Sequence, residues 1–510
     1  MKKIGIAFGL LGLGVGIAVW LWMNARMERL ARAGEAETPP TVRIDRAGPY
    51  LILASNAATT EFAKAVGAAK KLHPEAETAT FDPSHPESAR GALERLRPRY
   101  VMVVLKPEEL DVVFGWAWIK LTASLDDDPF VDTRTGFITG ESPEAAAAFV
   151  KRILDTAEGR LRLPGKMIDN LGPNTMAEKT AWHKTPGAFM IPCYEEQFGA
   201  ITISHGTQGF GKERLGEMDG AGFIHYGGHG YPDRVVDSLN GVYVRKLKLA
   251  PCVFFNGACY TGVTDRWFEL GARVKERYVD SRVCFCLGVL ANNAVAYLAA
   301  LHPDHGLPVY QEMERLAFTG APLGEIVRDT HDTVVLASGA SPFEPPVIKD
   351  GMRSPDWGPA EIMLYGTASR VLFGDPAMMP VEPFAEPPFT VTTNEADGSL
   401  DVEASVRNTK LKSTFANTFA SDLSETQQFN ARARLVFDIP STWGDEAKVE
   451  KLTVRAKGVE IPHRFVACAV EKDGDVRRLH VHVDARSTGY LESPLQQAGA
   501  MVVFRVTKTP

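Results

Sequence analysis

The sequence predicts an α/β domain with a mostly parallel sheet flanked by helices, followed by an antiparallel β-sandwich and preceded by a transmembrane helix. Between residues 48 and 380, short continuous apolar runs alternate with amphipathic segments, as in strands that helices cover on both faces. From residue 384 to 510, alternating β-branched segments are separated by turn residues, the pattern of a β-sandwich. Residues 1–24 are dominated by one apolar run.

The composition bounds the class of protein. The chain has 510 residues, of which 45% are hydrophobic and 23% charged, so it can bury several cores and is not disordered as a whole. Its net charge of −7, without a dense stripe of lysine and arginine, argues against nucleic acid as a partner. The 6 cysteines are too thinly spread for a disulfide framework.

The amino terminus predicts a membrane anchor or signal segment over residues 1–24. Lys2 and Lys3 precede about twenty apolar residues, the length that crosses a hydrocarbon core. The run is longer than a usual signal-peptide core and lacks a small-residue cleavage site, which favours an uncleaved single-pass anchor. Residues 25–47 then form a juxtamembrane linker. The short leading tail favours an extracytoplasmic body, which becomes a secreted one if the segment is cleaved.

The first half of the α/β domain shows its elements in order. "YLILA" (50–54) and "YVMVVL" (100–105) are apolar runs that predict buried strands, and residues 61–72 have helical spacing. Residues 142–159 predict the clearest helix, because Ser142 can cap it, a proline follows, and a glycine ends it.

Three further buried strands are predicted in the second half. They are "AGFIHY" (221–226), "PCVFFN" (251–256) and "VCFCLGVL" (283–290). In the third run, Cys284 and Cys286 alternate, so we interpret them as one face of a core strand.

The sandwich segments alternate apolar and polar residues. They are "FTVTTNEADGSLDVEASVRN", "ARARLVFDIP", "KLTVRAKGVEI", "RLHVHVDA" and "AMVVFRVTK". His480 and His482 alternate in the fourth of these, and we interpret them as part of a surface face rather than as ligands.

Two apolar runs each end in a glycine-flanked reactive residue. "GFIHYGGHG" ends near His229, and "CVFFNGACYTG" brings in Cys259 thirty residues later. Because the carboxyl ends of parallel strands share one edge of a sheet, neighbouring strands would present both residues to one crevice. A thiolate is a nucleophile, and a nearby imidazole can take its proton and later protonate a leaving group.

The small residues beside this pair have a chemical use. Glycine next to the histidine, and "GA" before the cysteine, allow the backbone to approach a substrate carbonyl closely. We therefore expect the main-chain N–H groups of Gly230 and Cys259 to form an oxyanion hole.

These residues carry a resemblance to a known family. The His-Gly and Ala-Cys pairs, in this order after two apolar runs, resemble the caspase-like clan of cysteine peptidases, and within it the gingipain family. "LDDDPFVDTRTGFITGESPEAAAAFVKRIL" (125–154) is similar to the aspartate-rich segment of that family, and "YGTASRVLFGDPAMMP" (365–380) is similar to its closing motif. The resemblance extends over residues 48–500.

The resemblance implies a caspase-like peptidase domain over residues 48–380 and an immunoglobulin-like β-sandwich over 384–510. It implies a cysteine endopeptidase that acts on polypeptides, with Cys259 as nucleophile, His229 as base and a thioester acyl-enzyme. No cofactor is required for such chemistry. Transpeptidation results if an amine replaces the attacking water.

Other interpretations use the same residues. His225 and His229 have the spacing of helical zinc ligands, but Gly227 and Gly228 between them each disfavour a helix by about 1 kcal/mol relative to alanine. His225 is an alternative base. A catalytically silent caspase-like scaffold, with a structural histidine and a buried Cys259, is an alternative of a different class.

A cysteine hydrolase of the α/β-hydrolase type is the rival enzyme. "GACYTG" resembles its nucleophile elbow, and "HYGGHG" resembles its glycine-rich oxyanion motif. That fold needs a histidine after the nucleophile, for which His302, His305 and His331 are available. The first two lie in the turn "HPDHG", which we expect near the crevice.

An acidic run suggests a structural ion. Asp126, Asp127, Asp128 and Asp132 are close in sequence and could hold calcium through clustered carboxylates, as the family resemblance hints. A solvated loop is the alternative.

Overall fold

The structure is a computed structural model, and it describes most of the chain from Val42 onward. The described residues are 42–169, 200–203, 218–236, 239–304, 312–313, 315–316, 319–382, 389–406, 431–443, 447–474, 476–485 and 499–508.

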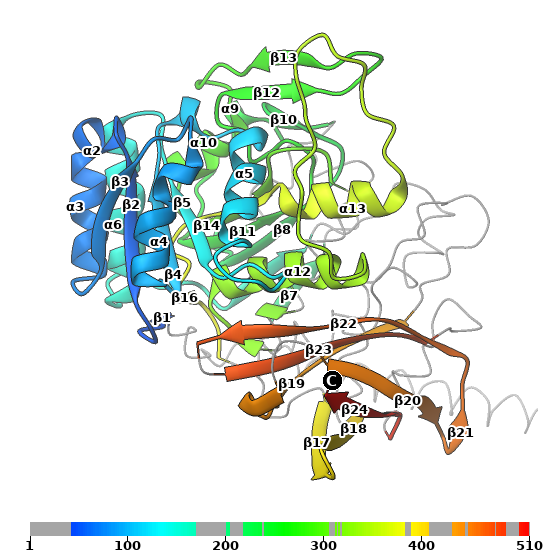
Figure 1. The fold of residues 1–510 in the computed structure, drawn as a ribbon. Helices are drawn as coiled ribbons and strands as arrows, with labels where there is room; N and C mark the ends of the chain where they lie inside the picture. The colour runs from blue at the N-terminus through cyan, green and yellow to red at the C-terminus, as the bar shows by residue number, and fades with distance from the viewer. Residues whose placement is uncertain are drawn as a thin grey trace, which may run out of the picture.

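A ten-stranded sheet organises the first part of the described chain (Figure 1). Its strand order is β3 (Glu77–Phe81), β2 (Tyr50–Ser55), β4 (Tyr100–Val104), β5 (Arg134–Ile138), β15 (Arg370–Phe373), β14 (Ala294–Ala300), β11 (Cys252–Asn256), β8 (Phe223–Tyr226), β6 (Lys166–Asp169) and β7 (Ala200–Ile203). Most neighbouring pairs are parallel, and β14 with β15 is antiparallel. The predicted α/β class, with a mostly parallel sheet, is confirmed.

Helices cover the sheet (Figure 1). They are α2 (Ala58–Glu61), α3 (Ala63–Leu72), α4 (Arg90–Leu96), α5 (Val112–Thr122), α6 (Pro143–Ala157), α9 (Gly241–Val244), α10 (Phe285–Ala291), α12 (Leu323–Ala337) and α13 (Pro359–Ala368), with 3-10 turns η1 (Pro86–Ala89), η2 (Pro107–Glu109) and η5 (Ser441–Trp443). Helix α6 packs between α3 and α10, and α13 packs between α5 and α12. The two groups bury the sheet between them, which explains why its central strands are apolar on both faces.

Several predicted elements are confirmed with small changes at their ends. The runs at 50–54 and 100–105 are β2 and β4, and both are buried throughout. The predicted helix at 142–159 is α6. Its Ser142 hydroxyl accepts a hydrogen bond from the N–H of Ala145 at 3.1 Å, as an N-cap does.

The prediction of a strand at "VCFCLGVL" is wrong. This run forms α10, and the Cys284 sulfur caps it by accepting from the N–H of Leu287 at 3.5 Å. Every residue from Phe285 to Leu290 is buried, so the run has no polar face to reveal its period. The strand of this region is the next apolar run, β14, which is buried along its whole length.

The carboxyl end of β15 ties the sheet to the first helices. Asp375 is fully buried and accepts hydrogen bonds from the Tyr50 hydroxyl at 2.8 Å and the Ala377 N–H at 3.0 Å. Its other oxygen pairs with the imidazole of His73 at 2.9 Å. Further along, β16 (Met378–Met379) pairs with β1 (Arg43–Ile44). The last residues of the predicted linker are therefore part of the folded unit.

The carboxyl-terminal part forms two antiparallel sheets. One has the order β17 (Phe389–Ala396), β18 (Ser399–Val406), β24 (Met501–Lys508), β20 (Ala447–Ala456) and β21 (Val459–Glu460), and the other β19 (Ala431–Ile439), β23 (Val476–Ala485) and β22 (His463–Asp473). Side chains of both sheets, such as Phe504 of β24 and Phe437 of β19, share one buried core. This arrangement is the predicted antiparallel sandwich.

The prediction that His480 and His482 lie on a surface face is wrong. Both side chains are buried, because β23 is the central strand of its sheet and this sheet faces the α/β part. The His480 ring stacks on Phe130 with ring centroids 4.4 Å apart. The sequence alternation was correct, but it could not tell which face another part of the chain would cover.

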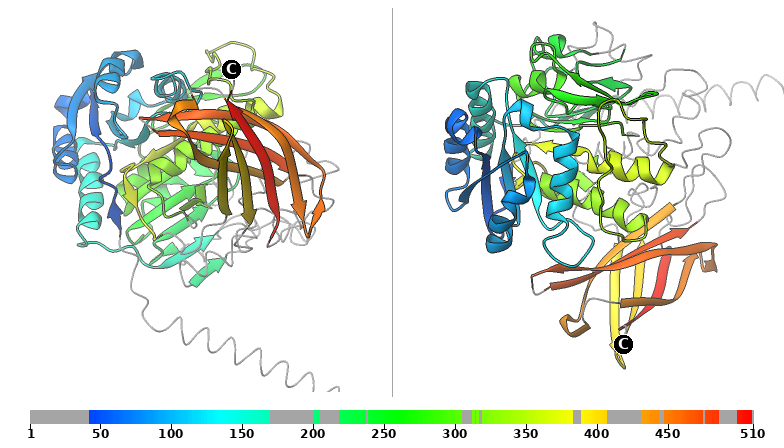
Figure 2. Two further views of the ribbon diagram at one scale, coloured as in Figure 1. Left: turned by 60° about the horizontal axis from the view of Figure 1, so that its bottom comes forward. Right: turned by 45° about the horizontal axis from the view of Figure 1, so that its top comes forward.

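The sandwich packs against the α/β part through β22, β23 and helix α12 (Figure 2). Arg328 of α12 donates to Glu471 of β22 at 2.6 Å, and the other oxygen of Glu471 contacts His480 at 2.8 Å. The N–H of Lys472 donates to the Asp128 carboxylate at 2.7 Å. Arg328 also contacts Glu325 of α12 at 2.8 Å, so Glu471 adds a partner from the sandwich to a pair within the α/β part.

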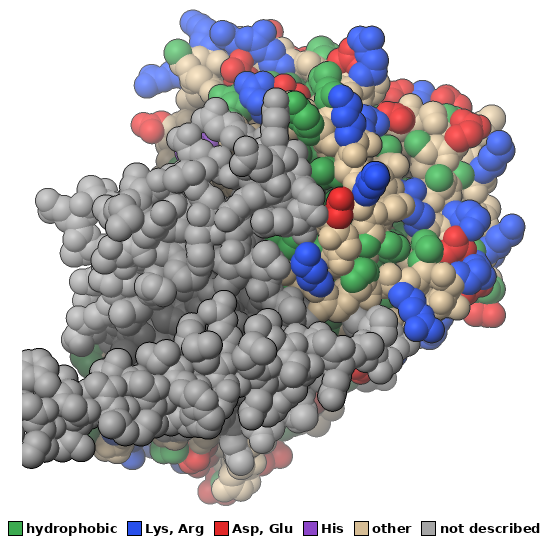
Figure 3. Space-filling model, turned by 180° about the vertical axis from the view of Figure 1, so that it is seen from behind, with side chains coloured by type: hydrophobic (Ala, Val, Ile, Leu, Met, Phe, Trp, Pro, Cys, Tyr) green, Lys and Arg blue, Asp and Glu red, His purple; other side chains and the backbone are tan. Residues whose placement is uncertain are grey.

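The predicted membrane segment, residues 1–24, lies outside the described residues. In the described ranges, no helix has the length and apolar character needed to cross a bilayer. Figure 3 shows one face of the molecule, on which basic and acidic side chains are mixed.

Candidate active site

Strands β8 and β11 set the position of the two predicted reactive residues. The strands are parallel neighbours, with Tyr226 in register with Asn256 at their carboxyl ends. The N–H of Gly257 donates to the Tyr226 carbonyl at 2.9 Å, so the loops that follow start side by side. The sequence predicted this adjacency, and the register confirms it.

A short hairpin carries His229. Strands β9 (Gly230–Tyr231) and β10 (Arg234–Val235) pair antiparallel, and the His229 carbonyl accepts from the N–H of Val236 at 2.7 Å. Gly228 has φ +140°, a conformation that side-chain-bearing residues rarely adopt, and it turns the chain out of β8. His229 is exposed at the start of this hairpin.

Gly230 brings the two loops into contact. It is buried, and a Cβ added to it would overlap the main-chain oxygen of Cys259 and lie 2.9 Å from the Cβ of Ala258. Only a residue without a side chain allows this approach. His229 is therefore one residue away from a direct contact with the backbone of Cys259.

The loop that carries Cys259 is held by its own hydrogen bonds. The Asn256 side chain accepts from the N–H of Ala258 at 2.9 Å, and the Thr261 hydroxyl donates to the Ala258 carbonyl at 2.7 Å. Tyr260 has φ +61°, an unusual value for a bulky residue, which marks a tight turn directly after the cysteine.

The thiol of Cys259 is protonated in this arrangement. Its sulfur donates to the main-chain oxygen of Asp304 at 3.3 Å. Burial, together with the negative charge of Asp304, raises the pKa of the thiol to about 12, although the charge of Arg370 opposes the shift. Among the described residues, no hydrogen bond joins the Cys259 sulfur to His229. The two groups are neighbours through their loops, and the thiol points to a different acceptor.

A buried cluster of charges lies behind the Cys259 loop. Arg370, the first residue of β15, donates two hydrogen bonds to Glu312, at 2.5 and 2.6 Å. It also donates to the Asp304 carboxylate at 2.9 Å and to the Asn256 carbonyl at 3.0 Å. All three charged side chains are at most 1% exposed.

Aromatic rings line the outer side of the Cys259 loop. Trp267 lies in the hairpin of β12 (Arg266–Glu269) and β13 (Lys275–Tyr278). Its ring lies 4.8 Å from that of Tyr260 and 6.4 Å from that of Tyr231. The two loops thus both contribute rings to one aromatic cluster.

The alternative histidines lie in different surroundings. His225 is a buried residue of β8. His302 is 1% exposed and packs among aromatic rings, including Trp116 at 5.0 Å, and burial lowers its pKa to about 3. His331 is buried on α12 against Phe343. His305 lies outside the described residues.

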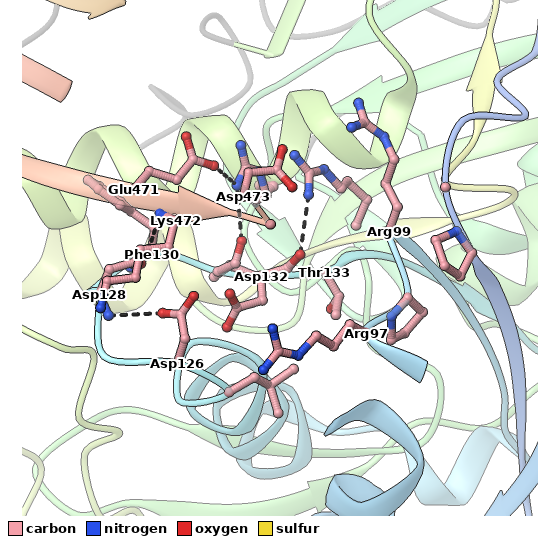
Figure 4. A pocket seen from close by; sticks show the side chains of 18 of the residues that line it. Arg97, Arg99, Asp126, Asp128, Phe130, Asp132, Thr133, Glu471, Lys472 and Asp473 are labelled. Atoms are coloured by element: carbon pink, nitrogen blue, oxygen red, sulfur yellow. Dashed lines mark hydrogen bonds and ion pairs between the residues drawn. The ribbon is translucent and has the colours of Figure 1, made fainter. Parts of the chain in front are cut away.

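The acidic run borders the junction between the two parts of the chain. Asp126, Asp132 and Arg97 face one cavity of about 290 Å³ beside β22 (Figure 4). Asp128 accepts from the N–H groups of Phe130 and Lys472, and Asp127 is exposed. In the part of the chain that the structure describes, no group of three or more His, Cys, Asp or Glu side chains could hold a metal ion. The predicted calcium site and the zinc interpretation of His225 with His229 are not found there.

Burial changes the protonation of this acidic run. Burial is the main cause that raises the pKa of Asp128 to about 7. The hydrogen bond from the N–H of Lys472 lowers this pKa, and the charge of Asp126 raises it. Burial, together with the charges of Asp126 and Asp128, raises the pKa of Asp132 to about 9.

Sequence reasoning missed the residues that support the cysteine. Asp304 lies in the turn "HPDHG", which was expected near the crevice, but only its histidines were singled out. Arg370 stands at the head of the apolar run "VLF", and a charge at the start of a buried strand was the available signal. Glu312 and Asn256 gave no local signal.

Comparisons with known proteins give matches to solved structures alone. No family model and no curated protein matches the sequence. A solved structure described as "Structure of Protease" aligns over 91% of this chain and 98% of its own, with 12% identity and a TM-score of 0.47.

Gingipain structures are also among the solved structures that align with this chain. The Arg-specific cysteine proteinase gingipain R (RgpB) aligns over 92% of this chain and 100% of its own, with 11% identity and a TM-score of 0.45. The separase–securin complex of Saccharomyces cerevisiae aligns over 54% of this chain and 15% of its own, with 10% identity and a TM-score of 0.34.

Proposed function

We propose that the protein is a cysteine endopeptidase in which Cys259 is the nucleophile and His229 is the general base. One observation carries the proposal: Gly230 packs against the main chain of Cys259, so the histidine loop and the cysteine loop meet at one edge of the sheet. A thiol and an imidazole on adjacent loops are the minimal set for acyl transfer through sulfur. The substrate class is polypeptide, as the family resemblance implies.

The reaction begins when the Cys259 thiol leaves the Asp304 carbonyl and gives its proton to His229. The thiolate attacks the scissile carbonyl, and a C–S bond forms as the carbonyl π electrons move to oxygen. The N–H groups of Gly230 and Cys259 stabilise this oxyanion. His229 then protonates the leaving amine, the C–N bond breaks, and water hydrolyses the thioester with His229 as base.

The raised pKa of the thiol makes this first step depend on substrate. With a pKa of about 12, almost no free thiolate exists near neutral pH. Transfer of the proton to His229 must therefore accompany binding or attack, rather than precede it as a stable ion pair. We expect slow alkylation of Cys259 by small reagents and faster reaction with peptide-like traps.

A catalytically silent scaffold is the second candidate, and the same thiol favours it. A cysteine that donates to a backbone oxygen, with its pKa raised by burial, is also what an inert structural cysteine looks like. In that case the loops at the sheet edge bind a peptide without cutting it.

Labelling with a peptide-like cysteine trap separates the two candidates. The endopeptidase should react at Cys259 with a peptidyl acyloxymethyl ketone, and Cys259→Ala should abolish hydrolysis of a mixed peptide library. Cys468→Ala is the matched control, because Cys468 is also half-buried but lies in β22 of the sandwich. Folded protein that neither labels at Cys259 nor loses library cleavage in Cys259→Ala contradicts the peptidase proposal.

The base is identified by a pair of histidine variants. His229→Ala should lower kcat/KM by about 10²–10⁴, because no other group in our mechanism takes the thiol proton. His225→Gln, measured with thermal unfolding alongside, should keep most of the activity. The opposite result would assign the base to His225.

We further propose that residues 1–24 anchor the body as a single-pass membrane protein with an extracytoplasmic catalytic part. The apolar length and the short charged leader support this arrangement. Carbonate extraction of membranes, combined with protease protection of the body, tests the anchor and its orientation.

A further inference from the structure

We propose that Arg370 is a positioning residue of the candidate active site, which it serves by holding Asp304 and Asn256 in place beside Cys259. The inference rests on the proposed function and adds a residue that does not itself touch the substrate.

All three guanidinium nitrogens of Arg370 donate hydrogen bonds. Nε and Nη2 hold Glu312 in a two-pronged contact, at 2.5 and 2.6 Å. Nη1 reaches both the Asp304 carboxylate at 2.9 Å and the Asn256 carbonyl at 3.0 Å. A lysine ammonium is a point charge and cannot make this set of directed contacts at once.

Two of these contacts lead directly to the Cys259 loop. Asn256 ends β11, and its side chain accepts from the N–H of Ala258, the residue before the nucleophile. Asp304 presents its main-chain oxygen to the Cys259 thiol at 3.3 Å. Arg370 therefore fixes Asn256 at the start of the Cys259 loop. It also fixes Asp304, whose main-chain oxygen accepts the hydrogen bond from the thiol.

The position of Arg370 follows from the sheet. It is the first residue of β15 and pairs with Ala300, the last residue of β14. Strand β14 runs parallel to β11, so its carboxyl end and Arg370 lie at the edge where the Cys259 loop begins. The side chain spans 114 residues of sequence to Asn256 and 66 to Asp304.

The charges of this cluster act on the thiol in opposite directions. The charged groups that affect the pKa of Cys259 are Asp304, which raises it, and Arg370, which lowers it, and the phenol of Tyr260 is a further titratable neighbour. Although burial alone would lower the pKa of Arg370, its carboxylate partners raise it, so the guanidinium stays charged. Changing either partner of the Arg370–Asp304 pair should therefore move the thiol in a predictable direction.

The test measures alkylation of Cys259 by iodoacetamide at fixed pH 8, read by peptide mass spectrometry with Cys468 as internal reference. Arg370→Met removes the cation that lowers the thiol pKa, so alkylation should slow by about tenfold. Asp304→Asn keeps the main-chain acceptor and removes the anion that raises the pKa, so alkylation should become about tenfold faster. A role limited to loop stability would make both variants faster, because a loosened loop exposes the thiol.

The second measurement is peptide hydrolysis by Arg370→Lys, which keeps the charge and guards against a methionine variant that fails to fold. Alkylation should stay near the wild-type rate, whereas kcat should fall about tenfold with KM nearly unchanged, because orientation is lost and charge is not. Arg134→Met is the matched control. It removes a buried arginine that pairs with Glu325 at 2.5 Å and lies on β5, the strand beside β15 in the sheet.

The outcomes separate this inference from the proposed function. Alkylation rates that shift in the same direction in Arg370→Met and Asp304→Asn, or an Arg370→Lys variant with wild-type kcat, overturn the positioning role. If the wild-type protein cuts no peptide but the alkylation rates move in opposite directions, the peptidase proposal fails while the electrostatic coupling of Arg370 to Cys259 stands.

Discussion

Gly230 lies so close to the carbonyl of Cys259 that no side chain fits between them. This contact joins the loop after β8 to the loop after β11, and it places an imidazole one residue from the backbone of a cysteine. The adjacency depends on a missing Cβ, so it can be tested by adding one.

Gly230→Ala should lower kcat/KM for peptide hydrolysis by at least about 10², since the added methyl group pushes the two loops apart. Gly227→Ala is the matched control in the same stretch, because a Cβ there meets nothing closer than the His225 ring at 3.9 Å. Circular dichroism should show both variants folded. Equal activity of the two variants would mean that the loop contact does not matter for catalysis.

Asp132→Asn should stabilise the protein at neutral and alkaline pH. The folded-state pKa of Asp132 is about 9 against an ordinary 3.8, so the native state keeps a proton that the unfolded state releases. Its contribution is complete below pH 4 and is lost as the pH rises from about 4 to 9. Urea unfolding at pH 8 should show a gain of about 1–3 kcal/mol, with little change at pH 4. Asp127→Asn, at a position whose side chain is 95% exposed, should change neither value.

Glu471→Ala should destabilise the protein by about 3–5 kcal/mol, because Arg328 and His480 then lose their shared partner inside the junction. Asp401→Ala, which breaks the pair with Arg505 on the exposed side of the sandwich, should cost about 1 kcal/mol or less. Both are measured by denaturant unfolding. Equal costs would mean that the buried contacts of Glu471 matter no more than an exposed ion pair.

His302→Phe should keep peptidase activity within a few-fold of the wild type. The His302 ring packs among Trp116, Trp357 and Tyr260, and a phenyl group can take the same place. The α/β-hydrolase interpretation needs a histidine after the nucleophile and expects a large loss on changing one of His302, His305 and His331. Peptide hydrolysis by this variant tests His302 for that role, and a large loss in His229→Ala would favour the peptidase order.

Local pattern was enough to predict much of the sheet and the place of the candidate site. The runs that form β2, β4, β8 and β11 are apolar because both faces of the sheet are buried. A continuous apolar run is the sequence pattern that such burial requires. Glycines beside His229 and small residues before Cys259 likewise record close backbone approach. The same reasoning failed for α10, since a segment buried on all sides shows neither a helical nor a strand period.

By itself, the sequence determined the α/β class, the sandwich after it, and the meeting of His229 and Cys259 at one sheet edge, because these follow from periodicity and from the direction of parallel strands. The tertiary structure alone decided which charged residues surround Cys259 and shift the pKa of its thiol. Arg370 lies 58 residues after Glu312 and 66 residues after Asp304 in the sequence. Their charges interact strongly only because burial removes water from around them. The acceptor of the Cys259 thiol and the burial of His480 at the junction depend on such long-range packing, which leaves no local trace.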